Sequence, residues 1–163
     1  MSGPDIAVSL TAGGWAAALP GVEDLCLRVA AVALGVARLP ADRLELSILL
    51  ADDATVRDLN LRYRGQDRPT NVLSFAALDG SPPPAEGPIL LGDVVLAWET
   101  VEAEAVRDGK TVAQHLSHLV VHGVLHLLGY DHQVDDQARE MESLESALLG
   151  ALGVPDPYAA DEP

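Results

Sequence analysis

All five histidines of the chain fall in one short stretch, between positions 115 and 132. Three of them, His122, His126 and His132, follow the spacing His-x3-His-x5-His. The first two are four residues apart, which places them on the same face of a helix with about 6 Å of rise between them. Two imidazoles at that spacing can bind one metal ion through bonds of about 2.0–2.1 Å. The pattern predicts a transition-metal site that holds one ion per chain, with zinc (Zn2+) as the default.

The third histidine has to reach the ion from outside this helix. Gly129 favours a left-handed residue that ends the helix, so that the chain turns back and brings His132 to the pair. Three ligands from one segment leave a coordination position open for water, which is typical of catalytic zinc sites rather than structural ones. Ordinary buried or surface histidines are the alternative, but three at this spacing favour the metal.

The two other histidines have different expected roles. His118 lies one turn before His122 on the same face, and it is about 12 Å along the axis from His126, which is too far for both to bind one ion. We expect His118 to orient a ligand, to pack in the core or to contact substrate. His115 is expected to be structural or exposed.

The residue after the first histidine separates two kinds of hydrolase. The same histidine spacing occurs in a class of zinc peptidases, in which a Glu at that position acts as general base. This chain has Gly123 there, and glycine cannot accept a proton from water. A metal could still polarise a phosphoryl oxygen, but a phosphodiester substrate also needs a cation for its phosphate. A peptidase or another metal-dependent hydrolase stays the alternative.

The charge of the chain limits its partners. Ten Lys and Arg residues stand against 25 Asp and Glu residues, a net charge of −15, whereas a general nucleic-acid binder is expected to be basic. Four arginines nevertheless lie within twelve positions: Arg57, Arg62, Arg64 and Arg68. They could supply the cation for a phosphate, and an ordinary solvated helix face is the alternative.

Length and composition indicate one domain. The chain has 163 residues, and we expect a single metal-binding domain over 1–153 followed by a flexible C-terminal tail at 154–163. The single cysteine, Cys26, allows neither a disulfide framework nor a cysteine zinc site within one chain, which fits a cytoplasmic location. No segment approaches the roughly 20 apolar residues that span a bilayer, so we expect no membrane partner. The first residues contain Asp5 and no basic stretch, unlike a signal peptide.

Hydrophobic periodicity and turn signals predict the elements that position these residues. Strands are expected at 4–10, 43–50, 70–76 and 89–97, and helices at 21–38, 53–64, 98–108, 111–128 and 134–151. Asp52 or Asp53 is the expected N-cap of the second helix and Gly65 its end, and Gly92–Asp93 indicates a bulge or a hairpin. Strands early and helices late indicate an α+β fold, with a small mixed sheet of three or four strands packed against about five helices.

Three segments together resemble one protein family. The segment HGVLHLLGYDH at 122–132 resembles the signature of the YbeY family, metal-dependent endoribonucleases of bacterial ribosomal RNA maturation. NLRYRGQDRPTNVLSF at 60–75 is similar to the family stretch N-x-x-Y-R-x-x-D-x-P-T-D-V-L-S-F, and LGDV at 91–94 is similar to L-G-D-I. One departure is Asn71, where the family stretch has an acid.

The resemblance implies zinc ligation by His122, His126 and His132, a functional role for Arg64 in the cleft that holds the metal, and a functional role for His118. It implies a single-strand-specific, zinc-dependent endoribonuclease that processes the 3′ end of 16S ribosomal RNA late in maturation and acts in ribosome quality control. The implied partners are precursor ribosomal RNA and the ribosomal small subunit with its proteins, and no DNA. Arg64 would hold the phosphate, by a bidentate fork. A non-catalytic ribosome assembly factor with a structural metal is a further alternative.

Overall fold

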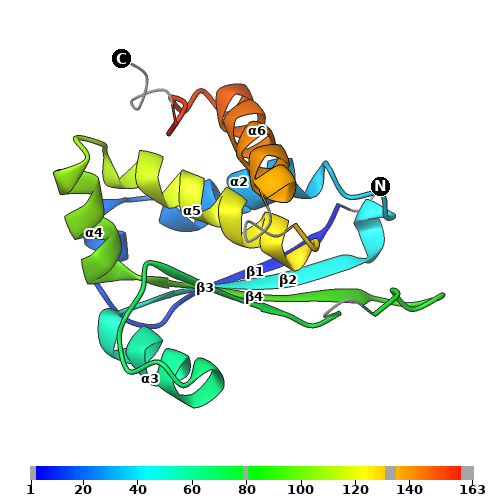
Figure 1. Ribbon diagram of the computed structural model, residues 1–163, viewed down its shortest axis with the longest axis horizontal. Helices are drawn as coiled ribbons and strands as arrows, with labels where there is room; N and C mark the ends of the chain where they lie inside the picture. Colours follow the sequence, from blue (N-terminus) through cyan, green and yellow to red (C-terminus); the bar gives the residue numbers. More distant parts are fainter. Residues whose placement is uncertain (1–2, 79–80, 131–134, 159–163) are drawn as a thin grey trace.

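The computed structural model describes residues 3–78, 81–130 and 135–158, and at its centre is a mixed β-sheet (Figure 1). The sheet has four strands in the order β1-β2-β4-β3. Their bounds are β1 Asp5–Leu10, β2 Leu44–Ala51, β3 Val72–Ala76 and β4 Ile89–Ala97. β1 and β4 run parallel to β2, whereas β3 runs antiparallel to β4. This arrangement confirms the α+β fold with a small mixed sheet.

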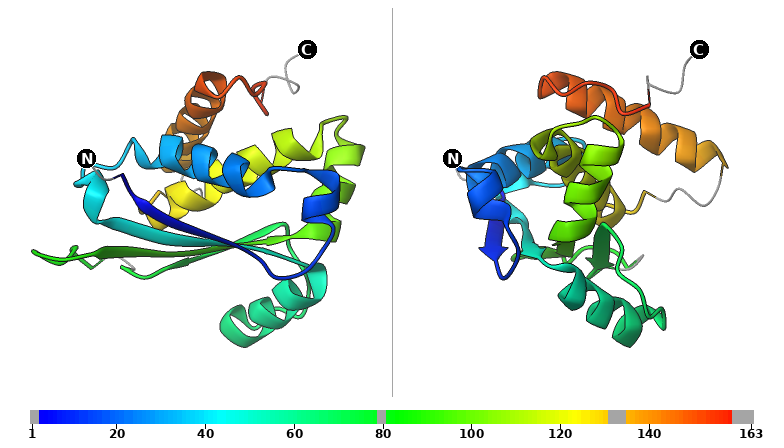
Figure 2. Two further views of the ribbon diagram at one scale, coloured as in Figure 1. Left: turned by 180° about the vertical axis from the view of Figure 1, so that it is seen from behind. Right: turned by 90° about the vertical axis from the view of Figure 1, so that its left-hand side faces the viewer.

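The helices cover the two faces of the sheet unequally. Over the described residues they are α1 Trp15–Ala18, α2 Val22–Leu34, α3 Asp53–Arg64, α4 Trp98–Arg107, α5 Val112–Leu127 and α6 Asp135–Ala151. α2 and α5 lie on one face with α6 packed outside α5, and α3 lies on the opposite face (Figures 1 and 2). None of the helices in the described ranges is long and apolar enough to cross a membrane.

Most expected elements are present within about two residues of their bounds, and the exceptions have physical causes. The helix expected at 21–38 ends at Leu34, because the amides of Gly35, Val36 and Ala37 bond to carbonyls only three residues back and close the last turn. The four-residue α1 was not expected, since one turn is too short for hydrophobic periodicity to show. It is held by Trp15, whose indole Nε1 donates to the Ala51 carbonyl at 2.9 Å.

Two apolar cores fix the helices on the sheet. The larger one lies between the sheet and helices α2, α5 and α6, and includes Ile48, Val94, Leu116 and Val120. Full burial of such side chains contributes about 1.5–3 kcal/mol each, so α5 is firmly held. The smaller core, under α3, is formed by Ala51, Val56, Leu73, Val95 and Ala97.

The Gly92–Asp93 pair marks a β-bulge and not a hairpin. Glu45 of β2 pairs with Leu90 of β4, but the next residue, Leu46, pairs with Gly92, so Leu91 is the extra residue. Gly92 has φ +134°, and a Cβ there would lie 2.0 Å from the Phe75 carbonyl oxygen. Only glycine lets β3 approach β4 this closely. Gly92 thereby allows the close pairing of β3, the strand that carries Ser74 and Phe75, with β4.

Candidate metal centre and its cleft

Helix α5 begins at a capping box and ends at the predicted glycine. Thr111 and Gln114 form a capping box in which each side chain accepts a hydrogen bond from the other residue's backbone amide. At the other end Gly129 has φ +101°, and the amide of Tyr130 donates back to the carbonyl of Leu125 at 3.1 Å. The predicted left-handed end of the helix at Gly129 is therefore confirmed.

His122 and His126 direct the same ring nitrogen toward one point. Their Nε2 atoms lie 3.0 Å apart, and the ring centroids are 4.5 Å apart. Two nitrogen lone pairs at this distance need a proton or a cation between them. Two ligands of a tetrahedral zinc ion are separated by about 3.3 Å, so the pair fits one metal ion with little movement.

The predicted third ligand, His132, lies outside the described residues. Within the described part of the chain, His, Cys, Asp and Glu side chains form no group of three that could hold a metal. The donor set seen there is thus the pair of imidazoles from α5, which matches the first two positions of the predicted site.

Glu145 of α6 fixes the orientation of His122. Its Oε1 accepts a hydrogen bond from His122 Nδ1, so the proton of the neutral imidazole is on Nδ1 and the lone pair of Nε2 faces His126. Its Oε2 accepts from the hydroxyl of Tyr158. Burial alone would raise the pKa of the Glu145 carboxyl, but hydrogen bonds from His118, His122 and Tyr158 outweigh it and lower the pKa to about 2. The carboxylate is therefore ionised at neutral pH.

His118 lies beside the histidine pair and not between its members. Its Nε2 is 3.4 Å from Glu145 Oε2 and 3.5 Å from the Tyr158 hydroxyl. The ring faces those of His122 and Tyr158 edge-on, with centroids 6.3 Å and 5.8 Å away. This position suits a residue that contacts Glu145 and the cleft, and the catalytic role of His118 stays a prediction.

Arg64 lines the same cleft as the histidines. The cleft has a volume of about 1090 Å³ and its walls include Arg64, Ser74, His118, His122, His126 and Tyr158. Arg64 is the last residue of α3, which Asp52 caps at its start and Gly65 ends with φ +68°. Its Nη2 donates to the Ser74 carbonyl at 3.0 Å. The hydroxyl of Ser74 in turn donates to the carbonyl of Gly123, next to His122, at 3.3 Å.

The three other arginines of the basic cluster are held by neighbouring side chains. Arg57 pairs with Asp67 at 2.6 Å. Arg62 pairs with Asp58 at 3.2 Å, and Arg68 donates to the Gln66 side chain at 3.0 Å. Among the four, in the part of the chain that the structure describes, it is Arg64 that reaches the cleft.

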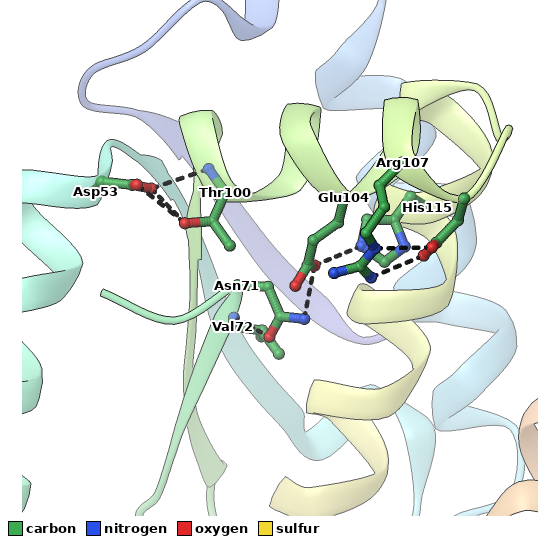
Figure 3. A network of polar contacts seen from close by, with 8 residues as sticks. Asp53, Asn71, Val72, Thr100, Glu104, Arg107 and His115 are labelled. Atoms are coloured by element: carbon green, nitrogen blue, oxygen red, sulfur yellow. Dashed lines mark hydrogen bonds and ion pairs between the residues drawn. The ribbon is translucent and has the colours of Figure 1, made fainter. Parts of the chain in front are cut away.

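Asn71, the departure from the family stretch, belongs to a half-buried polar network (Figure 3). Its Nδ2 donates to Glu104 Oε1 at 2.9 Å and its Oδ1 accepts from the Val72 amide at 2.7 Å. His115 Nε2 lies 2.8 Å from the same Glu104 oxygen. Burial lowers the pKa of His115, although the hydrogen bond to Glu104 opposes that shift. Asn71 and His115 thus join β3, α4 and α5, which supports the structural interpretation of His115.

Gly123 faces the sheet. A Cβ at this position would lie 2.7 Å from Val94 Cγ1 and 3.2 Å from the Ser74 hydroxyl. A side chain here would be directed into the packing between α5 and β4. The position therefore offers no room for the glutamate base of a zinc peptidase.

Sequence reasoning missed Glu145 and Tyr158. A signal was present: Met141, Glu145 and Leu149 follow a four-residue spacing on α6, and all three are buried at 0–1% exposure. A glutamate in an apolar stripe needs a partner. Tyr158 carried no such pattern, because it follows α6 in irregular backbone.

Comparisons with known proteins agree on one family. A family model described as "Endoribonuclease YbeY" matches residues 20–153. Curated proteins named "Endoribonuclease YbeY" from Paramagnetospirillum magneticum and Rhodospirillum rubrum are 59% and 56% identical to this chain, each over 94% of it. These matches cover 95% and 81% of the two relatives. The solution structure of TM1509 from Thermotoga maritima shares the fold with a TM-score of 0.53, at 23% identity over 91% of each chain.

Proposed function

The chain belongs to the endoribonuclease YbeY family, and on that premise we propose that it is a zinc-dependent endoribonuclease that cleaves single-stranded RNA. The proposed substrate is precursor ribosomal RNA, at the 3′ end of 16S ribosomal RNA late in maturation, with the ribosomal small subunit and its proteins as partners. Participation in ribosome quality control is part of the same proposal.

The observation that carries this proposal is the arrangement of His122, His126 and Arg64 around one cleft. The two Nε2 atoms 3.0 Å apart suit a metal ion, and His132 is the proposed third ligand. Arg64 lines the same cleft and is held there by the Ser74 carbonyl. A metal site and a guanidinium in one concave space suit a substrate that is negatively charged at the bond to be cleaved.

The histidines, Arg64 and His118 would have different roles in RNA cleavage. A zinc ion bound by the histidines would supply Lewis-acid activation of water and stabilise negative charge. Arg64 would bind a non-bridging phosphate oxygen through the remaining N–H groups of its fork. His118 lines the cleft beside Glu145 and would contact the substrate or a water molecule. Single-stranded RNA can present its phosphates inside such a cleft more easily than a duplex.

The net charge of −15 supports the proposal that a ribosomal protein brings the chain to its RNA substrate. An acidic body repels RNA at long range, and Arg57 and Arg62 are already paired with aspartates. In the described residues Arg64 contacts a carbonyl oxygen and Arg68 the Gln66 side chain, so these two arginines keep their charge but give only weak electrostatic attraction. Ribosomal proteins of the small subunit, which are proposed to dock the acidic surface, would bring the RNA to the cleft.

The test combines metal analysis with RNA cleavage. We expect purified wild-type protein to contain about one zinc ion per chain and to cleave single-stranded RNA, and His126→Ala to lose both. Arg62→Lys, outside the cleft, is the control and should keep both. Cleavage by metal-free His126→Ala would contradict the proposed mechanism. Zinc binding by wild type without cleavage, even with small subunits added, would favour the assembly-factor alternative, and cleavage of peptides would favour a peptidase.

A further inference from the structure

Glu145 is a buried acidic residue at a position where the neighbouring buried residues of the helix are apolar. It lies between Met141 and Leu149 on the face of α6 that packs on α5, with 0% of its surface exposed. It is the one buried acidic residue within the described ranges. Burying an ion pair usually contributes little to stability, and an apolar side chain of similar volume often stabilises more. Folding alone therefore does not account for a glutamate here.

The two oxygens of the Glu145 carboxylate accept hydrogen bonds from different residues. Oε1 binds His122 Nδ1, the nitrogen on the far side of the ring from His126. Oε2 binds the hydroxyl of Tyr158 and lies 3.4 Å from His118 Nε2. The carboxylate is thus not directed at the space between the two Nε2 atoms. It acts on that space through the imidazole of His122.

Tyr158 is held in place by a second set of hydrogen bonds. Asp156 Oδ1 accepts from the hydroxyl of Ser146 at 2.8 Å and from the amide of Tyr158 at 2.9 Å. This fastens the residues after α6 onto α6 itself. The Tyr158 ring then forms part of the cleft wall, and its hydroxyl occupies Oε2 so that Oε1 stays on His122.

We propose that Glu145 is a positioning residue for the metal site: it holds His122 as the tautomer whose Nε2 faces His126, and Tyr158 locks Glu145 in that position. The inference rests on the proposed function, since it assumes that the histidine pair binds zinc. A carboxylate behind a ligating histidine orients the ring and raises its basicity, and losing such a partner typically weakens metal binding 10- to 100-fold. The histidine pair of α5 is thus supported by Glu145 of α6 and by Tyr158, which follows α6.

The test measures zinc affinity and apoprotein stability on the same variants. Glu145→Gln keeps the shape and an acceptor for His122 but removes the charge, and we expect about 10- to 100-fold weaker zinc binding in competition with a chromogenic chelator. Glu145→Leu combined with Tyr158→Phe replaces both partners of the buried hydrogen bond by apolar groups. This variant should bind zinc more weakly still, while the apoprotein unfolds at the same or higher urea concentration. Tyr158→Phe should weaken binding less than Glu145→Gln. Glu140→Gln, exposed on the same helix, is the control and should match wild type.

The outcomes separate this inference from the proposed function. Zinc binding by wild type and by both Glu145 variants within about twofold would overturn the inference and leave the metal site intact. Affinity losses that follow losses of apoprotein stability would overturn it as well, because they would mark Glu145 as a residue of the fold only. If wild type binds no zinc, the proposed function fails first and the inference with it.

Discussion

The guanidinium of Arg64 is tied to the carbonyl oxygen of Ser74, 3.0 Å away, and its Cζ lies 5.8 Å from the centre of the Phe75 ring. These two contacts hold an exposed side chain at the edge of the cleft. They use only part of its donor set, since an arginine carries five N–H groups in a fixed fork. The remaining N–H groups are therefore available to a ligand in the cleft.

Arg64→Lys keeps the charge but loses the planar fork, so one amine has to replace both the Ser74 contact and the phosphate contact. We expect kcat/KM for RNA cleavage to fall about 10- to 100-fold, which corresponds to a charged hydrogen bond of about 1.5–3 kcal/mol. Zinc content should not change. Arg62→Lys, paired with Asp58 away from the cleft, is the matched control. Full activity in Arg64→Lys would rule out a bidentate contact.

Gly123→Ala should destabilise the protein by about 1–3 kcal/mol, because its Cβ would overlap Val94 Cγ1 at 2.7 Å in a packed interface. Gly150→Ala is the control on α6, where a Cβ meets nothing within 4 Å and the backbone is helical. That change should be neutral or stabilise by up to about 1 kcal/mol. Urea unfolding in the presence of a chelator measures both. Equal stability of the two variants would contradict the tight packing of α5 on β4.

Asn71→Asp replaces the Nδ2 donor by an oxygen 2.9 Å from Glu104 Oε1. Two carboxylates at that distance repel each other unless one takes up a proton. We expect a loss of about 1–3 kcal/mol in unfolding free energy at pH 8, and a smaller loss at pH 5, where the pair can share a proton. Adding Glu104→Gln to Asn71→Asp should restore most of the stability, since a donor again faces an acceptor. A double variant no more stable than Asn71→Asp would show that the pair is not coupled.

His115 makes the stability of the fold depend on pH. Its pKa is lowered in the folded protein, first by burial, so the folded state resists protonation while the unfolded state binds a proton near the ordinary histidine pKa of 6.5. The free energy of unfolding contributed by His115 is thus complete above that value and is lost as the pH falls below it. Glu104, His118 and Lys110 are the neighbours that act on this titration.

The measurement compares wild type with His115→Gln by urea unfolding of the metal-free protein. The glutamine keeps a donor for Glu104 but cannot titrate. We expect the stability advantage of wild type over His115→Gln to shrink between pH 7.5 and pH 5.5. An advantage that stays constant over this range would show that His115 takes up its proton as readily in the folded state as in the unfolded state.

Local signals in the sequence were sufficient for most of the fold. The alternation at 43–50 predicted β2, and Asp52 and Gly65 bounded α3, because caps and strand faces depend on a few adjacent residues. The helix expected at 21–38 was too long, since Gly35 alone did not reveal the tightening that ends α2 at Leu34. The strand order depends on long-range pairing, which no local signal encodes.

Local sequence signals likewise predicted only part of the candidate site. The His122–His126 pair followed from helical spacing, and the turn at Gly129 followed from glycine's tolerance of positive φ. The approach of Arg64 to the histidines required the pairing of β3 with β4 and the contact of Ser74 with Gly123, so only the family resemblance implied it. Glu145 required knowledge of which face of α6 is buried.

The helices that form the two sides of the cleft differ in how firmly they are packed on the sheet. His122 and His126 belong to α5, of which ten residues are buried, whereas Arg64 ends α3, of which only Val56 and Asn60 are buried. Local opening needs less free energy where less apolar surface is exposed by it. Backbone amides of α3 should therefore exchange with deuterium faster than those of α5. The Arg64 side of the cleft would then move more easily than the side formed by His122 and His126, so that the cleft could adapt to the proposed RNA substrate while this histidine pair keeps its geometry.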